Sequence, residues 1–269
     1  MPSADTLAKA IAPLTADPGR AGILLDVDGT LAPIVRHADD ASVTEQTRSL
    51  LIEISRRFGL VACVSGRRAS EARRIVSIGS ITYVGNHGAE VLRGGGTEPE
   101  LEGEIDSWAK RVQAFADDVD RGMLRRERIR FEDKGVIVAY HWRGAPDEES
   151  AEDALKEVAK GAERAGLHPY WGRKVLEIRP RVRFDKGTGV VALLRDLDLE
   201  VAMYVGDDTT DLDAFRGLRE LLEEGHLARV VLVGVRSEET PAGIEREADL
   251  LVDGTEGVAS LLQALIALR

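Results

Sequence analysis

The sequence contains a single cysteine, Cys63, among its 269 residues. One cysteine can form no intramolecular disulfide and no cysteine-rich zinc site, and it is typical of a chain from a reducing compartment. Cys63 lies within the apolar run from Leu60 to Val64, so we expect an unreactive thiol buried in the core.

Long hydrophobic runs are also missing. No stretch approaches the roughly 18 uninterrupted apolar residues that a membrane-spanning helix needs. The first residues lack the basic-then-apolar order of a signal peptide. We therefore expect a cytoplasmic protein without a membrane partner. We also expect a monomer.

Positive charge is in deficit, with 36 Lys and Arg against 47 Asp and Glu and a formal net charge of −11. A dedicated nucleic-acid binder normally carries a basic excess that neutralises phosphates, so we expect no nucleic-acid partner. A small phosphate-bearing substrate stays compatible with this charge, because a bound cation can supply positive charge locally.

Short runs rich in Val, Ile and Leu recur along the chain and predict strands that are buried on both faces. They lie at residues 22–28, 60–65, 81–85, 201–206, 229–234 and 250–252. Helical patterns alternate with them, at residues 44–58, 67–76, 187–194, 211–222 and 257–268. This alternation predicts an α/β fold with a doubly wound parallel sheet.

The middle of the chain follows another pattern after the flexible segment Gly94–Gly96. It reads as helix, two strands, helix, two strands, at residues 100–121, 129–133, 135–142, 148–165, 168–171 and 174–180. This order predicts an α+β domain over residues 97–180. It would be inserted into the α/β domain formed by residues 1–96 and 181–269.

Two polar fragments follow predicted strands near the start of the chain. In Asp26-Val-Asp28, alternate carboxylates leave a strand end, where ligands of open α/β sheets bind. Ser65-Gly-Arg67 places a hydroxyl and backbone N–H groups near a helix start, which suits an anion. Taken alone, Asp28 could equally cap a turn and Ser65 a helix.

Two further fragments lie near the end of the chain. Lys186 opens a helix, where the helix dipole favours an anion, so we expect this lysine to face a bound anion. Asp207, Asp208 and Asp211 fall within five residues after a strand, and their repulsion is relieved by a hard cation. The alternative for these aspartates is a solvated acidic helix start.

Joined in this order, the four fragments resemble the signature motifs of the haloacid-dehalogenase-like hydrolase superfamily. Between Ser65 and Lys186 there is room for a cap domain, and the α+β insertion is similar to the second cap type of that superfamily. A narrower resemblance is to the trehalose-6-phosphate phosphatases. It rests on residues 26–34, 83–90, 132–134, 141–143, 175–180, 206–211 and 214–215.

The resemblance implies a phosphatase mechanism for the core residues. Asp26 would attack phosphorus to form an aspartyl-phosphate, and Asp28 would act as general acid and then general base. Mg²⁺ would be held by Asp26, Asp207 and the main-chain carbonyl of Asp28. Ser65 and Lys186 would hold the phosphoryl oxygens. Asp208 and Asp211 would orient Asp207 or Lys186.

The resemblance also implies the groups that recognise the sugar, on the cap domain and the loop that contains Asn86. The candidates are Arg67, Asn86, His87, Glu132, Lys134, His141, Arg143, Glu177 and Arg179. Structural histidines are the alternative for His87 and His141. A plain solvent-facing strand surface is the alternative for Glu132, Lys134 and Glu177.

The leading functional hypothesis is therefore hydrolysis of trehalose 6-phosphate. A phosphatase for another sugar phosphate, such as sucrose 6-phosphate or a mannosyl- or glucosyl-glycerate phosphate, is a second hypothesis. A third is a non-catalytic domain that regulates a trehalose-synthesising partner. Such a domain could lose its nucleophile or its lysine, whereas Asp26 and Lys186 are both present here.

Overall fold

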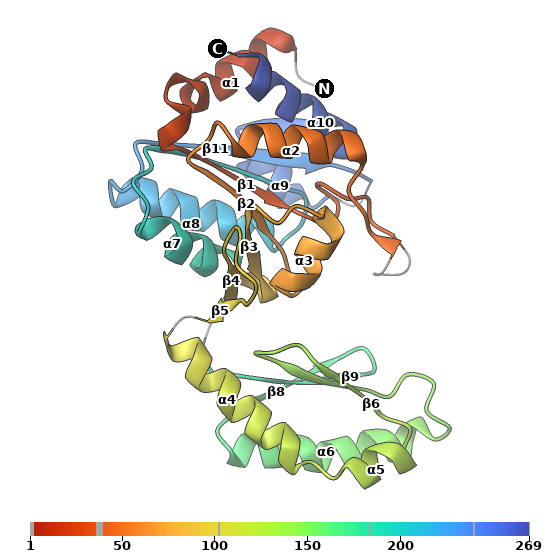
Figure 1. Ribbon diagram of the computed structural model, residues 1–269. Helices are drawn as coiled ribbons and strands as arrows, with labels where there is room; N and C mark the ends of the chain where they lie inside the picture. Colours follow the sequence, from red (N-terminus) through yellow and green to blue (C-terminus); the bar gives the residue numbers. More distant parts are fainter. Residues whose placement is uncertain (1–2, 36–39, 102, 183, 239, 269) are drawn as a thin grey trace. The chain divides into compact units, whose positions relative to one another are not determined.

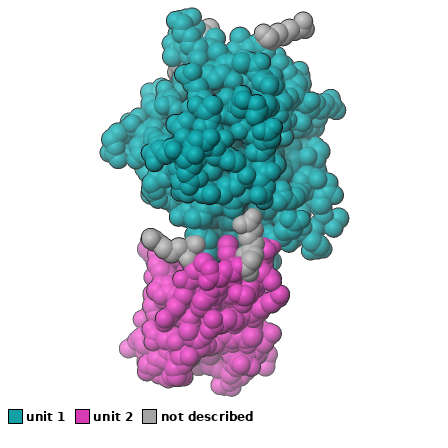
Figure 2. All heavy atoms as spheres, turned by 90° about the vertical axis from the view of Figure 1, so that its left-hand side faces the viewer, with its two compact units in different colours: residues 1–100, 184–269 teal, residues 101–183 magenta. Residues whose placement is uncertain are grey.

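The computed structural model describes residues 3–35, 40–101, 103–182, 184–238 and 240–268. The chain divides into two compact units (Figure 2). Unit 1 comprises residues 1–100 and 184–269, and unit 2 comprises residues 101–183. The division drawn from the sequence, before residue 97 and after residue 180, lies a few residues earlier at each boundary.

Unit 1 is built on an eight-stranded sheet with the order β12-β11-β10-β1-β2-β3-β4-β5. Six of its strands run parallel: β1 (Ala21–Asp26), β2 (Leu60–Val64), β3 (Thr82–Gly85), β10 (Val201–Gly206), β11 (Arg229–Arg236) and β12 (Leu250–Asp253). Strand β4 (Glu90–Leu92) is antiparallel to β3, and β5 (Glu100–Leu101) forms the edge. The predicted α/β fold with a parallel sheet is confirmed.

Helices cover both faces of this sheet (Figure 1). One face packs against α1 (Ala4–Ala16), α2 (Glu45–Ser55), α3 (Ala69–Val76) and α10 (Gly254–Ala267). The other packs against α7 (Lys186–Arg195), α8 (Asp211–Glu223) and α9 (Ala242–Glu247). On β1, Ile23 and Leu25 enter the first core and Leu24 the second. Because both faces are buried, the strand reads as one continuous apolar run.

The strand order places the candidate catalytic fragments side by side. Strand β1 lies between β10 and β2, all three are parallel, and Asp26 is in register with Val64. The carboxyl ends of the three strands therefore meet at one edge of the sheet, where Asp26 ends β1, Ser65 follows β2 and Asp207 follows β10.

Helix α1 was not predicted from the sequence. Its buried Leu7, Ile11 and Leu14 have the spacing of one helix face, and the hydroxyl of Ser3 caps its first turn. The pattern was present, but Pro13 inside the helix obscures it. Among the described residues, no helix is long and apolar enough to cross a bilayer.

Unit 2 contains an antiparallel sheet with the order β6-β7-β9-β8. The strands are β6 (Arg130–Asp133), β7 (Val138–His141), β8 (His168–Gly172) and β9 (Val175–Arg179). Helices α4 (Gly103–Asp118), α5 (Arg121–Arg126) and α6 (Glu148–Arg164) pack against one face of it, around Tyr140 and Leu176. The opposite face, called the polar face below, carries Glu132, Glu177 and Tyr170 in one cross-strand row.

Two buried tyrosines differ in what their hydroxyls contact, and this difference predicts opposite effects on stability. The Tyr83 hydroxyl donates to the Ile78 carbonyl at 2.6 Å, whereas the buried Tyr140 hydroxyl has no hydrogen-bond partner among the residues that the structure describes. Tyr83→Phe should lower the free energy of unfolding of unit 1 by about 1 kcal/mol, and Tyr140→Phe should leave that of unit 2 unchanged or raise it.

Urea unfolding checks both changes. Far-UV circular dichroism follows the whole chain, and tryptophan fluorescence follows unit 2, because Trp108, Trp142 and Trp171 all lie there. A loss for Tyr140→Phe as large as that for Tyr83→Phe would contradict this account.

Candidate active site

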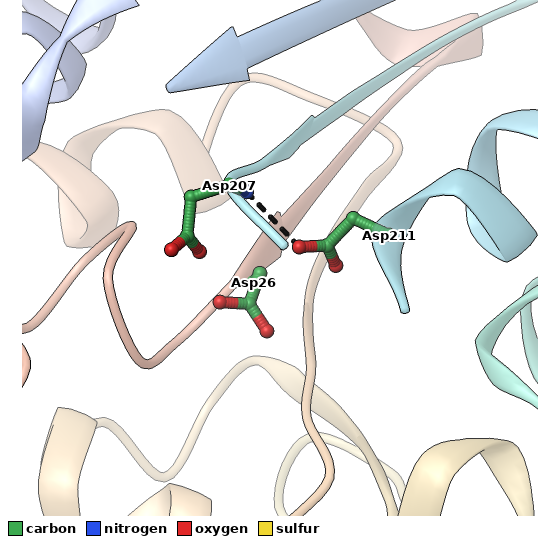
Figure 3. Close-up of side chains that lie close together, drawn as sticks. All are labelled: Asp26, Asp207 and Asp211. Atoms are coloured by element: carbon green, nitrogen blue, oxygen red, sulfur yellow. Dashed lines mark hydrogen bonds between the residues drawn. The ribbon is translucent and has the colours of Figure 1, made fainter. Parts of the chain in front are cut away.

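Three buried aspartates meet at the carboxyl ends of β1 and β10. Asp26, Asp207 and Asp211 turn their carboxylates toward one another (Figure 3), and one oxygen of each lies within 4.8 Å of the others. Asp26 ends β1, Asp207 follows β10 and Asp211 begins α8. This is the one such acidic group in the part of the chain that the structure describes.

The ammonium of Lys186 enters this group from the first residue of α7. It donates to Asp26 Oδ1 at 2.6 Å and to Asp211 Oδ1 at 2.7 Å, and the lysine is only 3% exposed. The side chain of Asp185 caps the helix by accepting from the Thr188 N–H. This cap fixes the backbone from which the Lys186 side chain extends. An ammonium has three protons, and the third stays available for a bound anion.

Asp211 accepts four hydrogen bonds and holds the site together. Its Oδ1 accepts from Lys186 and from the Tyr204 hydroxyl, both at 2.7 Å. Its Oδ2 accepts from the backbone N–H groups of Asp207 and Asp208, both at 3.0 Å. These four bonds occupy the lone pairs of the carboxylate, which fits the orienting part expected of Asp211 from the sequence.

The three carboxylates carry more negative charge than one ammonium offsets. Burial raises the pKa of Asp26 well above its usual range, and although Lys186 acts against this, the charges of Asp211 and Asp207 add to it. Burial and Asp211 also raise the pKa of Asp207 to about 6. The pKa of Lys186 is raised despite burial, because Asp26 and Asp211 flank the ammonium. A further cation would relieve this imbalance.

The donor atoms suit a hard divalent cation. Asp26 and Asp207 offer carboxylate oxygens close together, and Mg²⁺ is usually bound through one or two carboxylates. The turn after β1 lies directly against Asp207, since a Cβ on Gly29 would be 2.1 Å from Asp207 Oδ2. In the same turn the Thr30 hydroxyl donates to Asp207 Oδ1 at 3.2 Å, which fixes that carboxylate.

Arg67 contacts the carboxylate of Asp28. Its Nε and Nη2 each donate to one Asp28 oxygen at 2.7 Å, in the two-bonded geometry that guanidinium and carboxylate groups favour. Within the described chain, Asp28 does not belong to the close acidic group of Asp26, Asp207 and Asp211. Arg67, expected from the resemblance to bind the substrate, is therefore drawn to Asp28 in this conformation.

The segment that contains Asn86 and His87 braces the Ser65 turn. The N–H of Asn86 donates to the Arg67 carbonyl at 2.7 Å and that of His87 to the Ser65 carbonyl at 3.1 Å. The His87 ring packs on Gly66, where a Cβ would be 2.6 Å from it. The Ser65 hydroxyl accepts the Arg67 N–H at 3.1 Å, which leaves its own proton free to reach a phosphoryl oxygen.

Asp208 lies at the surface of the turn after β10. It is exposed, and its side chain accepts the N–H of Thr209 at 2.6 Å. It helps to shape the turn that presents Asp207, whereas Asp211 carries the contacts to Lys186.

Five of the expected sugar-binding residues lie in unit 2 on the polar face or at its margin. His141 Nε2 lies 2.7 Å from Glu132 Oε2, and Lys134 donates to Glu177 at 3.0 Å. Arg179 donates through Nε to Glu177 at 2.9 Å and stacks on the Tyr170 ring, 3.9 Å from its centroid. Arg143 lies apart from them, in the turn after β7, and contacts the Arg173 carbonyl at 3.4 Å.

Glu177 is the centre of this polar network. Burial would raise the pKa of its carboxyl, but the hydrogen bonds from Arg179 and Lys134 outweigh burial and hold the pKa below its usual value. The carboxylate is therefore charged and fixed at neutral pH. Paired acceptors and donors of this kind match the hydroxyls of a sugar.

The sequence profile described as trehalose-phosphatase matches residues 24–246. The chain belongs to the trehalose-phosphatase family. Trehalose-phosphate phosphatase B of Arabidopsis thaliana is 32% identical over 214 residues, which cover 74% of this chain and 56% of that protein. This trehalose-phosphatase family member spans 55–62% of the length of three such plant relatives.

Solved structures share the fold of the chain. The C-terminal domain of C. albicans trehalose-6-phosphate phosphatase matches with a TM-score of 0.64 and 21% identity, over 100% of this chain and 98% of that one. The C-terminal domain of the Candida albicans trehalose synthase regulatory protein matches with a TM-score of 0.59 and 15% identity, over 96% and 97%. At these identities the likeness establishes the trehalose-phosphatase family fold alone.

Two residues of this family member were not assigned a role from the sequence, Glu90 and Tyr204. The buried Glu90 accepts the first N–H of α3, from Ala69, at 2.6 Å, and it also hydrogen-bonds the Asn86 side chain. It thereby ties α3 to the segment that braces Ser65. Both residues lie in apolar strand patterns. The only signal in the sequence was that each carries a polar group close to the end of a strand.

Gly88 allows the Asn86 segment to approach α7 in this trehalose-phosphatase family member. Its φ is +102°, and a Cβ there would be 2.2 Å from the Asp185 carbonyl oxygen. Gly88→Ala should cost about 1–2 kcal/mol through the backbone conformation and about 1–3 kcal/mol more through overpacking. It should also displace Lys186, and with it any hydrolysis that depends on this lysine should fall.

Gly95→Ala is the matched control, because Gly95 has a φ of +81° but no heavy atom within 4 Å of the added Cβ. Urea unfolding and an activity assay on both variants test whether the close approach at Gly88, rather than its backbone conformation alone, supports the site. The account is wrong if the two variants lose equal stability.

Proposed function

We propose that this chain is a Mg²⁺-dependent phosphatase that hydrolyses trehalose 6-phosphate to trehalose and phosphate. The observation that carries the proposal is the buried Lys186, which bridges Asp26 and Asp211 beside Asp207. Such a site offers Asp26 as a carboxylate nucleophile, Lys186 as an ammonium, and oxygens of Asp26 and Asp207 for a metal ion, at two neighbouring strand ends. Family membership supports the choice of substrate.

In the proposed reaction, a carboxylate oxygen of Asp26 attacks phosphorus, and the bond from phosphorus to the sugar oxygen breaks. Asp28 gives a proton to the departing sugar oxygen. Water then attacks the aspartyl-phosphate, Asp28 takes its proton, and phosphate leaves with Asp26 regenerated. Bound Mg²⁺ would be held by Asp26, Asp207 and the Asp28 carbonyl and would offset charge on the phosphoryl group.

Ser65 and Lys186 are proposed to hold the phosphoryl oxygens. The Ser65 hydroxyl has a proton to donate, and Lys186 has one left beside its bonds to Asp26 and Asp211. Both donors are fixed before substrate arrives, so they stabilise charge in the transition state without reorganising. Phosphoryl transfer depends chiefly on such positioning.

The pair of Arg67 and Asp28 has to open during this reaction. With both its oxygens on the guanidinium, the Asp28 carboxylate cannot also reach a leaving oxygen. A phosphate dianion offers Arg67 an alternative partner of similar geometry. We therefore propose that Arg67 exchanges Asp28 for the substrate, which fits its expected part in substrate binding.

The polar face of unit 2 is proposed to recognise the sugar. In unit 1, Asn86 and His87 are also proposed as substrate-binding residues. The pair of Glu132 and His141 and the group of Lys134, Glu177 and Arg179 supply fixed donors and acceptors, and Tyr170 adds an exposed ring. A site built to hydrogen-bond hydroxyls rejects substrates that lack them, because its polar groups are then left unpaired.

A regulatory, non-catalytic domain is the second candidate, since the fold is shared with the regulatory-protein domain described above. The fold does not separate the two functions, and the residues favour the catalytic one. Asp26, Lys186 and Asp207 form a complete set here, with Lys186 at hydrogen-bond distance from Asp26. Nothing in a purely regulatory role requires these buried charges.

Phosphate release from a panel of sugar phosphates tests the proposal. The panel contains trehalose 6-phosphate, sucrose 6-phosphate and glucosylglycerate phosphate, each with Mg²⁺ and with EDTA. We expect the highest kcat/KM for trehalose 6-phosphate, loss of hydrolysis in EDTA and recovery when Mg²⁺ is added. Release from none of them would favour the regulatory function, and full activity without metal would exclude the metal assignment.

Replacing the nucleophile separates its chemistry from the fold. Asp26→Asn keeps the size of the side chain but removes the attacking charge, so kcat should fall by about 10³-fold or more. The fold should persist, because burial already raises the pKa of the Asp26 carboxyl and so disfavours its charged form, and the amide of asparagine carries no charge. Activity above a tenth of wild type, with the melting temperature unchanged, would exclude Asp26 as the nucleophile.

Glu177 tests the sugar-binding assignment. Glu177→Ala removes the centre of the polar network, so kcat/KM for trehalose 6-phosphate should fall by about 10–100-fold, the scale of one or two polar contacts. p-Nitrophenyl phosphate has no sugar hydroxyls and should be hydrolysed almost as before.

Glu157→Ala is the control for this change, because Glu157 also lies in unit 2 and pairs with a lysine, Lys160, but on the exposed surface of α6. Glu157→Ala should leave kcat/KM unchanged for both substrates. Equal losses on both substrates for Glu177→Ala would show that Glu177 supports the fold instead.

A further inference from the structure

The hydroxyl of Tyr204 is a neutral side-chain donor to the cluster of Asp26, Lys186 and Asp211. Tyr204 lies on β10, fully buried, and donates to Asp211 Oδ1 at 2.7 Å. Its ring packs edge-on against Phe215 of α8, with the centroids 6.0 Å apart. The hydrogen bond to Asp211 fixes the hydroxyl, and the packing against Phe215 fixes the ring that carries it.

The two oxygens of Asp211 serve different parts of the site. Oδ2 accepts from the N–H groups of Asp207 and Asp208 and so fixes the turn on the proposed metal side. Oδ1 accepts from Lys186 and Tyr204 and so faces the proposed phosphate side. A change that acts on Oδ1 alone should therefore affect the lysine and leave the turn intact.

We propose that Tyr204 is a positioning residue that sets the place of Lys186 between Asp26 and Asp211. By sharing Oδ1, the hydroxyl reduces the pull of Asp211 on the ammonium and fixes the plane of the carboxylate. Lys186 then keeps its 2.6 Å contact with Asp26 and aims its third proton at a phosphoryl oxygen. This inference rests on the proposed phosphatase function, because it concerns the lysine that would hold phosphate.

Removal of the hydroxyl should have a selective effect. In Tyr204→Phe, Asp211 Oδ1 loses one of its two donors and draws Lys186 toward itself, away from Asp26. The ring and its contact with Phe215 remain, so the fold should persist. The turn that presents Asp207 should also persist, because both its bonds to Oδ2 are unchanged.

Tyr83→Phe is the matched control. Tyr83 is equally buried in unit 1, and its hydroxyl also makes one hydrogen bond, but to the Ile78 carbonyl. Both variants lose one buried hydrogen bond of a tyrosine. Only Tyr204 contacts the charged cluster, so the control measures what such a loss does to the fold alone.

The experiment compares the full-length wild type with both variants in three measurements. They are kcat and KM on trehalose 6-phosphate and p-nitrophenyl phosphate, the Kd of inorganic phosphate by calorimetry, and the Mg²⁺ concentration that gives half activation. For Tyr204→Phe we expect about a 10-fold lower kcat and about 10-fold weaker phosphate binding, the scale of one hydrogen bond to a charged group. Half activation by Mg²⁺ should shift by less than about 2-fold, because the bonds on Oδ2 remain.

Three results would overturn the inference. They are a Tyr204→Phe variant that keeps more than half of kcat and of phosphate affinity, equal losses in Tyr83→Phe, or a shift in Mg²⁺ dependence as large as the loss in kcat. A double-mutant cycle with Asp211→Asn adds a second test, since Tyr204→Phe should cost little once Asp211 is neutral.

The same measurements distinguish a failure of the proposed substrate from a failure of the role proposed for Tyr204. A wild type that binds phosphate but does not prefer trehalose 6-phosphate would contradict the proposed function and leave the positioning test intact, because phosphate binding reports on Lys186 directly.

Discussion

The rest of the site depends on the ion pairs that the buried ammonium of Lys186 makes with two aspartates. It lies between Asp26 and Asp211, almost without exposure, in a cluster that also contains Asp207. Buried charges are costly unless they are paired and hydrogen-bonded, so each carboxylate constrains the others through this one cation. Three chain segments that are far apart in the sequence are thereby held at one edge of the sheet.

Close backbone approaches make that arrangement possible. Gly29 leaves room for the Asp207 carboxylate, Gly206 leaves room for Asp211, and Gly88 lets the Asn86 segment reach the start of α7. A Cβ at any of these positions would lie within 2.5 Å of another atom. The glycines therefore determine how tightly the segments that carry Asp26, Lys186 and Asp207 converge.

The fold, and the strand ends at which the candidate site residues lie, were largely predictable from the sequence. Continuous apolar runs identified the parallel strands, and the strand ends identified Asp26, Ser65 and Asp207 as neighbours. What could not be predicted depends on three-dimensional packing. The pairing of Arg67 with Asp28 joins residues on different strand ends, and the roles of Tyr204 and Glu90 depend on hydroxyl and carboxyl groups hidden in apolar patterns.

The stability of Lys186→Met in metal-free buffer tests most directly whether this ammonium organises the site. The account predicts a loss of about 3–5 kcal/mol in the free energy of unfolding, because two buried carboxylates lose their partner. Lys9→Met, which breaks the exposed pair with Asp5, should change it by less than about 1 kcal/mol. Urea unfolding followed by circular dichroism measures both. A Lys186→Met protein as stable as wild type, or more stable, would contradict the account.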